Sequence, residues 1–278
     1  MRIECLVTLG ALALAAAITE SALGQQTTIF HDDFESANFN NWTVASGTNM
    51  TIDSTKNIDP AGFGRYSAHS TASEVRLYHN LAGDNGGAEV DGASTLTAWI
   101  YDSSMTRTYV QALGYSGAGY NSGSLDQLLG IGKYTSVSLP GDVYDPTKYQ
   151  GRVLYGVNEG WFNLNLPGTP SRSPGWHEFT ISREADDTTI DFYVDGILGR
   201  KITGSRTEAW DSITMGFGFS SSSNGDTWYD GISVTVAPVP EPSLMSLGIL
   251  GWFVLAAAGV SRRKKPTATA ETASAACA

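Results

Sequence analysis

Three aspartates near the two ends of the central region could hold a hard cation. Asp32 and Asp33 lie on the first predicted strand, and Asp230 lies on the last. If these terminal strands pair, the carboxylates come together, and they repel each other unless a cation or a hydrogen-bond donor lies between them. Calcium binds carboxylate and carbonyl oxygens. We therefore expect one structural calcium ion at Asp32, Asp33 and Asp230; the alternative is that the acids cap strand ends in water.

A second group of candidate residues is aromatic and lies between the predicted strands. Aromatic rings can stack on sugar faces beside polar groups, although they are also ordinary core residues of β-sandwiches. Trp99 and Phe192 lie within predicted strands, and we assign them to the core. The loop rings expected to bind a ligand are those of Tyr115, Tyr120, Tyr134, Trp161 and Trp210, and Tyr144 and Tyr149 are further loop aromatics.

No pattern of residues predicts catalysis. Retaining glycosidases place two carboxyl groups about 5 Å apart, and the nearest acidic string, EADDTT at residues 184–189, lacks a final acid and lies at a predicted turn. The four histidines have no zinc-site spacing, and no Gly-x-Ser-x-Gly elbow occurs. They are His31, His69, His79 and His177. We predict that the chain is not an enzyme.

The segments that must position these residues are predicted to be strands. Apolar and polar residues alternate with period two between clusters of Gly, Asn, Asp and Ser. In residues 95–101 and 189–194 every second side chain is apolar, which places Asp191 and Tyr193 on an outer face. Further predicted strands are 28–34, 74–79, 108–113, 153–157, 177–182, 214–219 and 232–236. About ten strands predict an all-β domain of two packed sheets or a barrel.

The net charge limits the classes of binding partner, and the positions of the cysteines limit the possible disulfides. The chain has 17 basic and 28 acidic residues and a net charge of −11. Nucleic acid is excluded as a partner, because binding to phosphates requires the opposite sign. Divalent cations and neutral partners such as glycans are compatible with this acidity. The two cysteines, Cys5 and Cys277, lie outside the central region, so we expect no disulfide there.

Both ends of the chain differ from the middle. Residues 1–24 carry an apolar run of about 13 residues, which as a helix spans only about 20 Å, and they are predicted to be a signal peptide. Residues 244–260 contain no charge and are followed by a basic cluster. Because such clusters stay in the cytoplasm, this segment is predicted to be a transmembrane helix whose preceding domain is exported. The cluster consists of Arg262, Arg263, Lys264 and Lys265.

A short motif precedes the apolar segment: Val239, Pro240, Glu241, Pro242 and Ser243. Motif, apolar span and basic cluster, over residues 238–265, resemble the PEP-CTERM sorting signal of Gram-negative bacteria. The resemblance implies passage through the export machinery, a transient stay in the inner membrane, cleavage by an exosortase-type processing enzyme, and delivery to the cell envelope or extracellular matrix. The low-complexity tail 266–278 departs from the pattern, which usually ends at the basic cluster.

Three segments of the central region resemble concanavalin A-like or laminin-G-like jelly-roll domains. They are residues 29–35, the segment 175–181 with its continuation 192–196, and residues 228–234. Asp195 and Gly196 independently predict a two-residue type I′ turn. The resemblance implies an all-β, two-sheet antiparallel jelly-roll sandwich over residues 25–237, flanked by the N-terminal signal peptide and the C-terminal transmembrane helix.

That fold hosts lectins, hydrolases and adhesion modules, so three functions stay open. The leading hypothesis is an exported module that binds carbohydrate or exopolysaccharide. A structural or adhesion protein of the matrix, without a small ligand, is the second. A glycan hydrolase or lyase is the third, and it requires convergent acids that the sequence does not reveal.

Overall fold

The computed structural model describes residues 26–47, 50–58, 64–71, 75–103, 106–154, 159–204, 207–217 and 225–237. Residues Gln25–Ala237 form one compact unit. Within the described ranges the chain has no helix that is long and apolar enough to cross a membrane. The predicted signal peptide (1–24), sorting motif (239–243), membrane segment (244–260), basic cluster (262–265) and tail (266–278) all lie outside these ranges.

The described residues form strands joined by turns and loops. In chain order the strands are β1 (Thr27–Asp32), β2 (Thr43–Ser46), β3 (Met50–Asp53), β4 (Ser67–Ser70), β5 (Arg76–Asn80), β6 (Ser94–Asp102), β7 (Thr108–Tyr115), β8 (Leu125–Lys133), β9 (Gln150–Leu154), β10 (Gly160–Asn163), β11 (Gly175–Arg183), β12 (Thr189–Val194), β13 (Ile197–Thr203), β14 (Ser212–Gly216) and β15 (Thr227–Val236).

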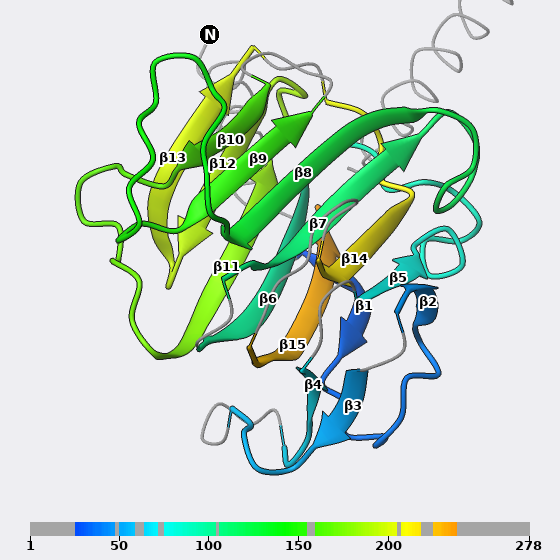
Figure 1. The fold of residues 1–278 in the computed structure, drawn as a ribbon. Helices are drawn as coiled ribbons and strands as arrows, with labels where there is room; N and C mark the ends of the chain where they lie inside the picture. Colours follow the sequence, from blue (N-terminus) through cyan, green and yellow to red (C-terminus); the bar gives the residue numbers. More distant parts are fainter. Residues whose placement is uncertain are drawn as a thin grey trace, which may run out of the picture. The chain divides into compact units, whose positions relative to one another are not determined.

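These strands build two antiparallel sheets packed face to face (Figure 1). Sheet A has the order β13-β12-β11-β6-β15-β4-β3, with β1 also paired to β15. Sheet B has the order β10-β9-β8-β7-β14-β5-β2. Figure 1 shows sheet B in front of sheet A, with no described strand lying over its outer face. The prediction of an all-β, two-sheet antiparallel sandwich is confirmed.

The core lies between the sheets and follows the period-two pattern. On β6 the burial alternates strictly, and Leu96, Ala98 and Ile100 are at most 1% exposed. Val110 and Ala112 of β7 face the same core from sheet B. Each buried large apolar side chain contributes about 1.5–3 kcal/mol relative to an exposed one.

Trp99 was predicted to be a core residue, and this is wrong. It lies between Ala98 and Ile100 on β6, and both of those side chains point inward. Since successive side chains of a strand point to opposite faces, Trp99 lies half-buried on the outer face of sheet A. Phe192 is fully buried in the core, as predicted.

The predicted hairpin turn is confirmed. Asp195 and Gly196 have φ of +50° and +72° and connect β12 to β13, as a type I′ turn requires. Asp195 thereby lies beside β11, where its carboxylate accepts a hydrogen bond from the Glu178 N–H at 2.9 Å. The turn therefore fixes the position of a carboxylate as well as the register of the hairpin.

All nine predicted strands overlap observed ones, and six observed strands had no prediction. The longest of the six, β8, contains Gly130 and Gly132, which weakened the strand pattern in the sequence. At Gly132, φ is +146° and a Cβ atom would lie 2.3 Å from the Thr108 carbonyl oxygen. Glycine is required there because the neighbouring strand approaches too closely for any side chain.

Candidate functional site

A row of directly opposed residues crosses the outer face of sheet B. In order along the sheet it consists of Trp161 (β10), Arg152 (β9), Gly130 (β8), Gln111 (β7), Thr214 (β14) and Tyr78 (β5). Neighbouring strands lie about 4.8 Å apart, so this central row spans about 24 Å. An aromatic cluster lies at each end of the row.

The Trp161 cluster, at one end, consists of Tyr109, Tyr134, Trp161, Arg107 and Arg152. The rings of Tyr134 and Trp161 stack 4.0 Å apart at an angle of 6°, and Tyr109 meets Trp161 edge-on at 5.2 Å. The Arg152 guanidinium lies 5.3 Å from the Trp161 ring, and that of Arg107 lies 5.0 Å from Tyr134. Both distances fall within the range of a cation–π interaction.

The Tyr120 cluster, at the other end, consists of Tyr78, Tyr115, Tyr120 and Arg76. Tyr78 and Tyr120 stack at 4.2 Å, and the Arg76 guanidinium lies 5.7 Å from the Tyr120 ring. Burial, followed by the neighbouring Tyr120, raises the pKa of Tyr115 to about 12, so its hydroxyl stays protonated. Tyr78 and Tyr120 are half-buried, which leaves part of each ring exposed to solvent.

Polar groups on this face lack protein partners. Thr214 donates a hydrogen bond to Gln111 Oε1 at 3.2 Å, but Gln111 Nε2 has no partner although its residue is fully buried. The Arg152 Nε, Tyr115 hydroxyl and Ser212 Oγ atoms are also buried without a hydrogen-bond partner. More than nine in ten buried polar groups in proteins are paired. Of these atoms, Gln111 Nε2 and Arg152 Nε belong to the central row.

Four of the five predicted binding aromatics meet on this face. Tyr115 and Tyr120 belong to one cluster and Tyr134 and Trp161 to the other. Trp210 does not join them: it is fully buried, its backbone pairs with Val90, and its ring lies 5.1 Å from the Arg183 guanidinium. The sequence placed Trp210 in a loop because an isolated bridge has no strand pattern.

The three predicted cation ligands have different surroundings. Asp32 accepts hydrogen bonds from the Phe34 N–H, from Asn41 Nδ2 and from Trp42 Nε1 at 2.8–3.2 Å. Asp230 is fully buried. Burial, and to a smaller extent the charges of Asp33 and Glu35, raise its pKa to about 7, although hydrogen bonds from the N–H groups of Ile58 and Gly231 act in the opposite direction. Among the described residues no group of three His, Cys, Asp or Glu side chains could hold a metal ion.

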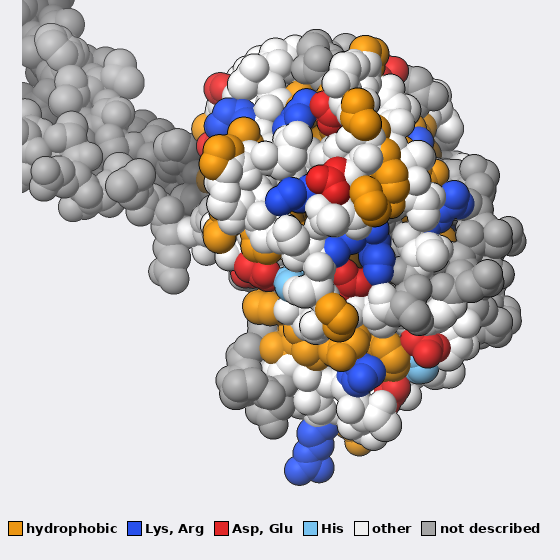
Figure 2. Space-filling model, turned by 60° about the vertical axis from the view of Figure 1, so that its left-hand side comes forward, with side chains coloured by type: hydrophobic (Ala, Val, Ile, Leu, Met, Phe, Trp, Pro, Cys, Tyr) orange, Lys and Arg blue, Asp and Glu red, His pale blue; other side chains and the backbone are white. Residues whose placement is uncertain are grey.

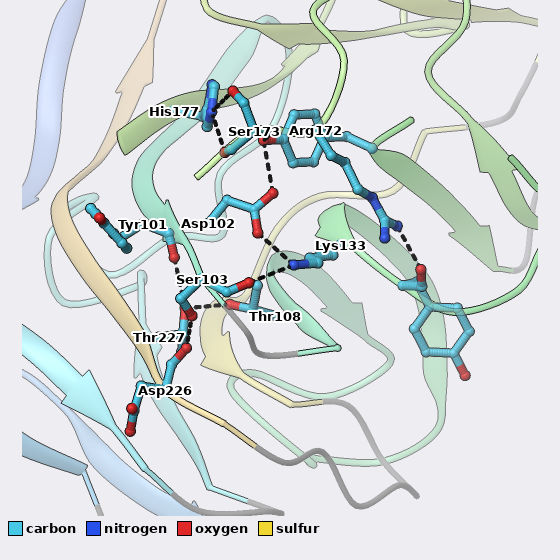
Figure 3. Close-up of polar contacts among 12 residues, drawn as sticks. Tyr101, Asp102, Ser103, Thr108, Lys133, Arg172, Ser173, His177, Asp226 and Thr227 are labelled. Atoms are coloured by element: carbon cyan, nitrogen blue, oxygen red, sulfur yellow. Dashed lines mark hydrogen bonds and ion pairs between the residues drawn. The ribbon is translucent and has the colours of Figure 1, made fainter. Parts of the chain in front are cut away.

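A second polar region, the Asp102 network, lies beside a cavity of about 270 Å³ (Figure 3). Asp102 pairs with Lys133 and accepts a hydrogen bond from the Tyr149 hydroxyl at 3.1 Å. That hydroxyl accepts the N–H of Ser173, at 3.3 Å. Arg172 donates to the carbonyl of Tyr134 and to Gln150. On the side of the molecule drawn in Figure 2, basic and acidic side chains adjoin one another near the middle.

His177 extends this network to the hairpin turn. Its Nε2 atom lies 3.0 Å from both Ser173 Oγ and the Ser173 carbonyl oxygen, and its Nδ1 lies 2.8 Å from Asp195. Burial opposes the charge, but the Asp195 hydrogen bond and charge, with the Ser173 carbonyl, raise the pKa of His177 above its usual value. This order of Ser, His and Asp was not predicted, because Asp195 reaches His177 only through the turn.

The order matches that of a serine hydrolase triad, but the surroundings differ from one. A triad needs free N–H groups near the serine to stabilise the oxyanion. Here the N–H of Ser173 is donated to Tyr149, and Pro174 has none. The Ser173 carbonyl beside Nε2 favours a protonated imidazole, which donates hydrogen bonds on both sides. The arrangement therefore suits an imidazolium that ties the Ser173 loop to the hairpin turn.

Sheet A carries an aromatic row of its own on its outer face. Trp176, Tyr101, Trp228 and His69 are directly opposed on β11, β6, β15 and β4. His69 stacks on Trp228 at 4.3 Å, and Lys56 lies over both Tyr101 and Trp228. The Trp228 indole N–H is donated to Asp53 at 2.8 Å. The His69 ring nitrogens lie 3.3 Å from Asp53 and 3.4 Å from Asp226, so the polar side-chain atoms of His69 and Trp228 are paired within the protein.

Comparison with known proteins gives similarities of fold only. No protein-family model and no curated protein matches the chain. A carbohydrate esterase from a Shiga toxin-encoding bacteriophage, phi24B, has a TM-score of 0.47 and 15% identity, over 77% of this chain and 100% of that one. Domain 4 of the arabinanase AbnA from Geobacillus stearothermophilus, solved with arabinotriose, has a TM-score of 0.43 and 14% identity, over 80% and 98%. A xylan-binding domain from Paenibacillus barcinonensis Xyn10C has a TM-score of 0.36 and 10% identity, over 75% and 99%.

Proposed function

We propose that the chain is a carbohydrate-binding module and that it binds a polysaccharide chain along the central row of sheet B. One observation carries the proposal: an aromatic cluster with an arginine lies at each end of a row in which two nitrogen atoms, Gln111 Nε2 and Arg152 Nε, have no protein partner. Sugar rings supply apolar C–H faces for stacking and hydroxyl groups for the open donors. A row of about 24 Å suits an extended chain of several sugar units better than a single sugar.

The other two polar regions support this role less well. In the Asp102 network Asp102 pairs with Lys133, and the Ser173 N–H is already donated to Tyr149. This favours a structural role for the Asp102 network and supports the prediction that the chain is not an enzyme. In the sheet A row the Trp228 N–H and the His69 ring have protein partners. A structural matrix protein without a ligand is the second candidate, which the open donors of sheet B count against.

We further propose that the module is exported through the signal peptide, sorted by the motif at 239–243, and displayed on the cell envelope or in the extracellular matrix. The resemblance of residues 238–265 to the PEP-CTERM signal supports this, and so does the jelly-roll resemblance of the central region. Intact-mass analysis of the protein from cell envelope and medium tests it. A product that begins near Gln25 and ends near Pro240 is expected, and an uncut chain in the membrane would contradict the sorting step.

The expected calcium ion stays a proposal, with Asp32, Asp33 and Asp230 as its predicted ligands. Because the pKa of Asp230 is raised, the folded protein binds that proton more tightly than the unfolded chain, and stability falls as the pH rises through about 7. Each pKa unit corresponds to about 1.4 kcal/mol. A bound cation would reverse this by stabilising the carboxylate. In thermal melts between pH 5 and 8, the melting temperature is expected to fall with rising pH in the presence of EDTA but not in the presence of calcium. If calcium has no effect and Asp230→Asn raises the melting temperature at pH 8, the cation site does not exist.

Binding of the full-length protein to a panel of soluble neutral and acidic polysaccharides, measured by affinity electrophoresis, tests the proposed function. Truncation of a central interface aromatic typically costs more than about 1–2 kcal/mol. Tyr120→Ala is therefore expected to weaken binding by about tenfold or more. Trp176→Ala on sheet A is the matched control and is expected to leave binding unchanged. Loss of binding in Trp176→Ala alone would place the site on sheet A. Binding to no glycan would favour the role of a structural matrix protein.

A further inference from the structure

We infer that the polysaccharide bound by this face is anionic and that a sugar carboxylate is recognised by the Trp161 cluster. This rests on the proposed function and names the class of its ligand. The geometry points to it through one residue above all, Arg152. The guanidinium of Arg152 lies within an acidic protein, on a face where a ligand can reach it.

Arg152 is a half-buried cation on the outer face of sheet B that has no ion-pair partner among the described residues. Lys133, Arg200 and Lys201 pair with Asp102, Asp142 and Asp191 respectively, whereas Arg152 forms no ion pair with any described residue. It is half-buried, its Nε has no hydrogen-bond partner, and burial lowers its pKa. A charge withdrawn from water without a partner is costly. An anion bound beside it would remove that cost.

The aromatic rings of this cluster hold the cations in place. Tyr134 and Trp161 stack at 4.0 Å, so no guanidinium fits between them, and Arg107 and Arg152 lie on the remaining sides of the pair. Trp161 is only 5% exposed. A sugar therefore has little free ring surface for stacking here. What this end offers a ligand is positive charge in a fixed orientation.

The chemistry of the guanidinium selects a planar anion. Its fork of N–H groups matches a carboxylate in two parallel hydrogen bonds, which a neutral hydroxyl cannot reproduce. At the other end of the row, Tyr78 and the neighbouring Tyr120 offer partly exposed rings to the rest of a glycan. Arg152 and Tyr78 are four strand spacings apart, about 19 Å. A uronic-acid polysaccharide long enough to cover this distance meets both ends.

Polygalacturonate and its fully methyl-esterified form are the probes that test the inference, because they differ in charge and share a backbone. Affinities of the full-length protein are measured by calorimetry at two salt concentrations. Polygalacturonate is expected to bind at least tenfold more tightly than the ester, with affinity falling as salt rises. Arg152→Gln is expected to abolish this preference, because it lowers the affinity for polygalacturonate far more than the affinity for the ester. Arg152→Lys keeps the charge without the fork and is expected to retain only part of the preference.

Two controls separate the possible failures. Lys56→Gln removes a cation that lies over aromatic rings on sheet A, and it is expected to leave the preference unchanged. Circular dichroism and melting temperature establish that each variant is folded. If both polymers bind equally and Arg152→Gln changes neither, the inference fails and the proposed function stands. If neither these polymers nor the neutral glycans bind, the proposed function fails with it.

Discussion

The central row of sheet B and the Asp102 network both combine arginines, tyrosines and neutral polar groups, and they meet at Tyr134. The Tyr134 ring belongs to the Trp161 cluster, and its carbonyl accepts a hydrogen bond from Arg172. They differ in how far their polar groups are paired. Asp102, Lys133 and His177 each have at least two partners, whereas Gln111 and Arg152 retain open donors. Arg172 Nε of the Asp102 network is also unpaired, but Asp102, Lys133 and His177 tie separate segments together, which favours a structural role for that network.

Removing Asp102 is expected to have the largest effect and to act on stability alone. Asp102→Ala leaves the Lys133 ammonium without its carboxylate in a site where both side chains are largely buried. Breaking a buried ion pair by removing one partner costs about 3–5 kcal/mol. The free energy of unfolding in urea should fall by about that amount.

Asp102→Ala also tests whether the Asp102 network takes part in glycan binding. Glycan affinity of Asp102→Ala, measured at a temperature where the variant is folded, should equal that of the wild-type protein. Lys201→Ala breaks an ion pair outside both regions, between an ammonium that is 45% exposed and an Asp191 side chain that is 4% exposed, and it too should leave glycan affinity unchanged. A loss of glycan binding in folded Asp102→Ala would place the binding site in the Asp102 network.

Replacing Gln111 should have the opposite balance of effects. Gln111→Met removes a buried amide N–H₂ that has no partner, together with one hydrogen bond from Thr214. Unsatisfied buried groups cost about 1–3 kcal/mol and a typical hydrogen bond contributes about 0.5–1.5 kcal/mol, so stability should be unchanged or slightly higher. Glycan affinity should fall roughly tenfold, which is about 1.4 kcal/mol.

The control for Gln111→Met is Thr214→Val, which breaks the same hydrogen bond and leaves the open donor in place. It should weaken binding less than Gln111→Met does. Should Gln111→Met lower the free energy of unfolding by several kcal/mol, the amide would have a structural role, and the contrast between the two regions would lose its strongest example.

The same contrast explains what the sequence could predict. Residues 95–101 and 189–194 showed alternation of apolar and polar side chains, and both are strands whose apolar side chains lie in the core. The error at Trp99 came from applying hydrophobicity without that alternation. Tyr115, Tyr120, Tyr134 and Trp161 were predicted as binding residues, yet their division into two clusters depends on strand register.

Other features depend on contacts between distant segments. The central row joins six strands, from Trp161 on β10 to Tyr78 on β5, through pairings that no local pattern encodes. The open donor of Gln111 follows from which side chains lie opposite β7. Likewise, Asp195 reaches His177 because it lies in the type I′ turn at the end of β12, and β12 pairs with the strand that carries His177. The residue types of the candidate site could therefore be predicted from the sequence, whereas the hydrogen-bond partners of these residues could not.

The smallest expected effect is a dependence on pH that marks the Asp102 network as structural. Because the pKa of His177 is raised, the folded protein holds this proton more tightly than the unfolded chain; the stabilisation is complete below the ordinary pKa of 6.5 and is lost as the pH rises through the folded-state value. Asp195 is partly exposed, so the effect should be at most about 1 kcal/mol. Asp230 changes stability in the same direction, and the test is therefore the difference in unfolding free energy between wild type and His177→Gln, from pH 5.5 to 8.5. That difference should shrink as the pH rises, and a difference independent of pH would show that His177 is neutral in the fold and open to act as a base.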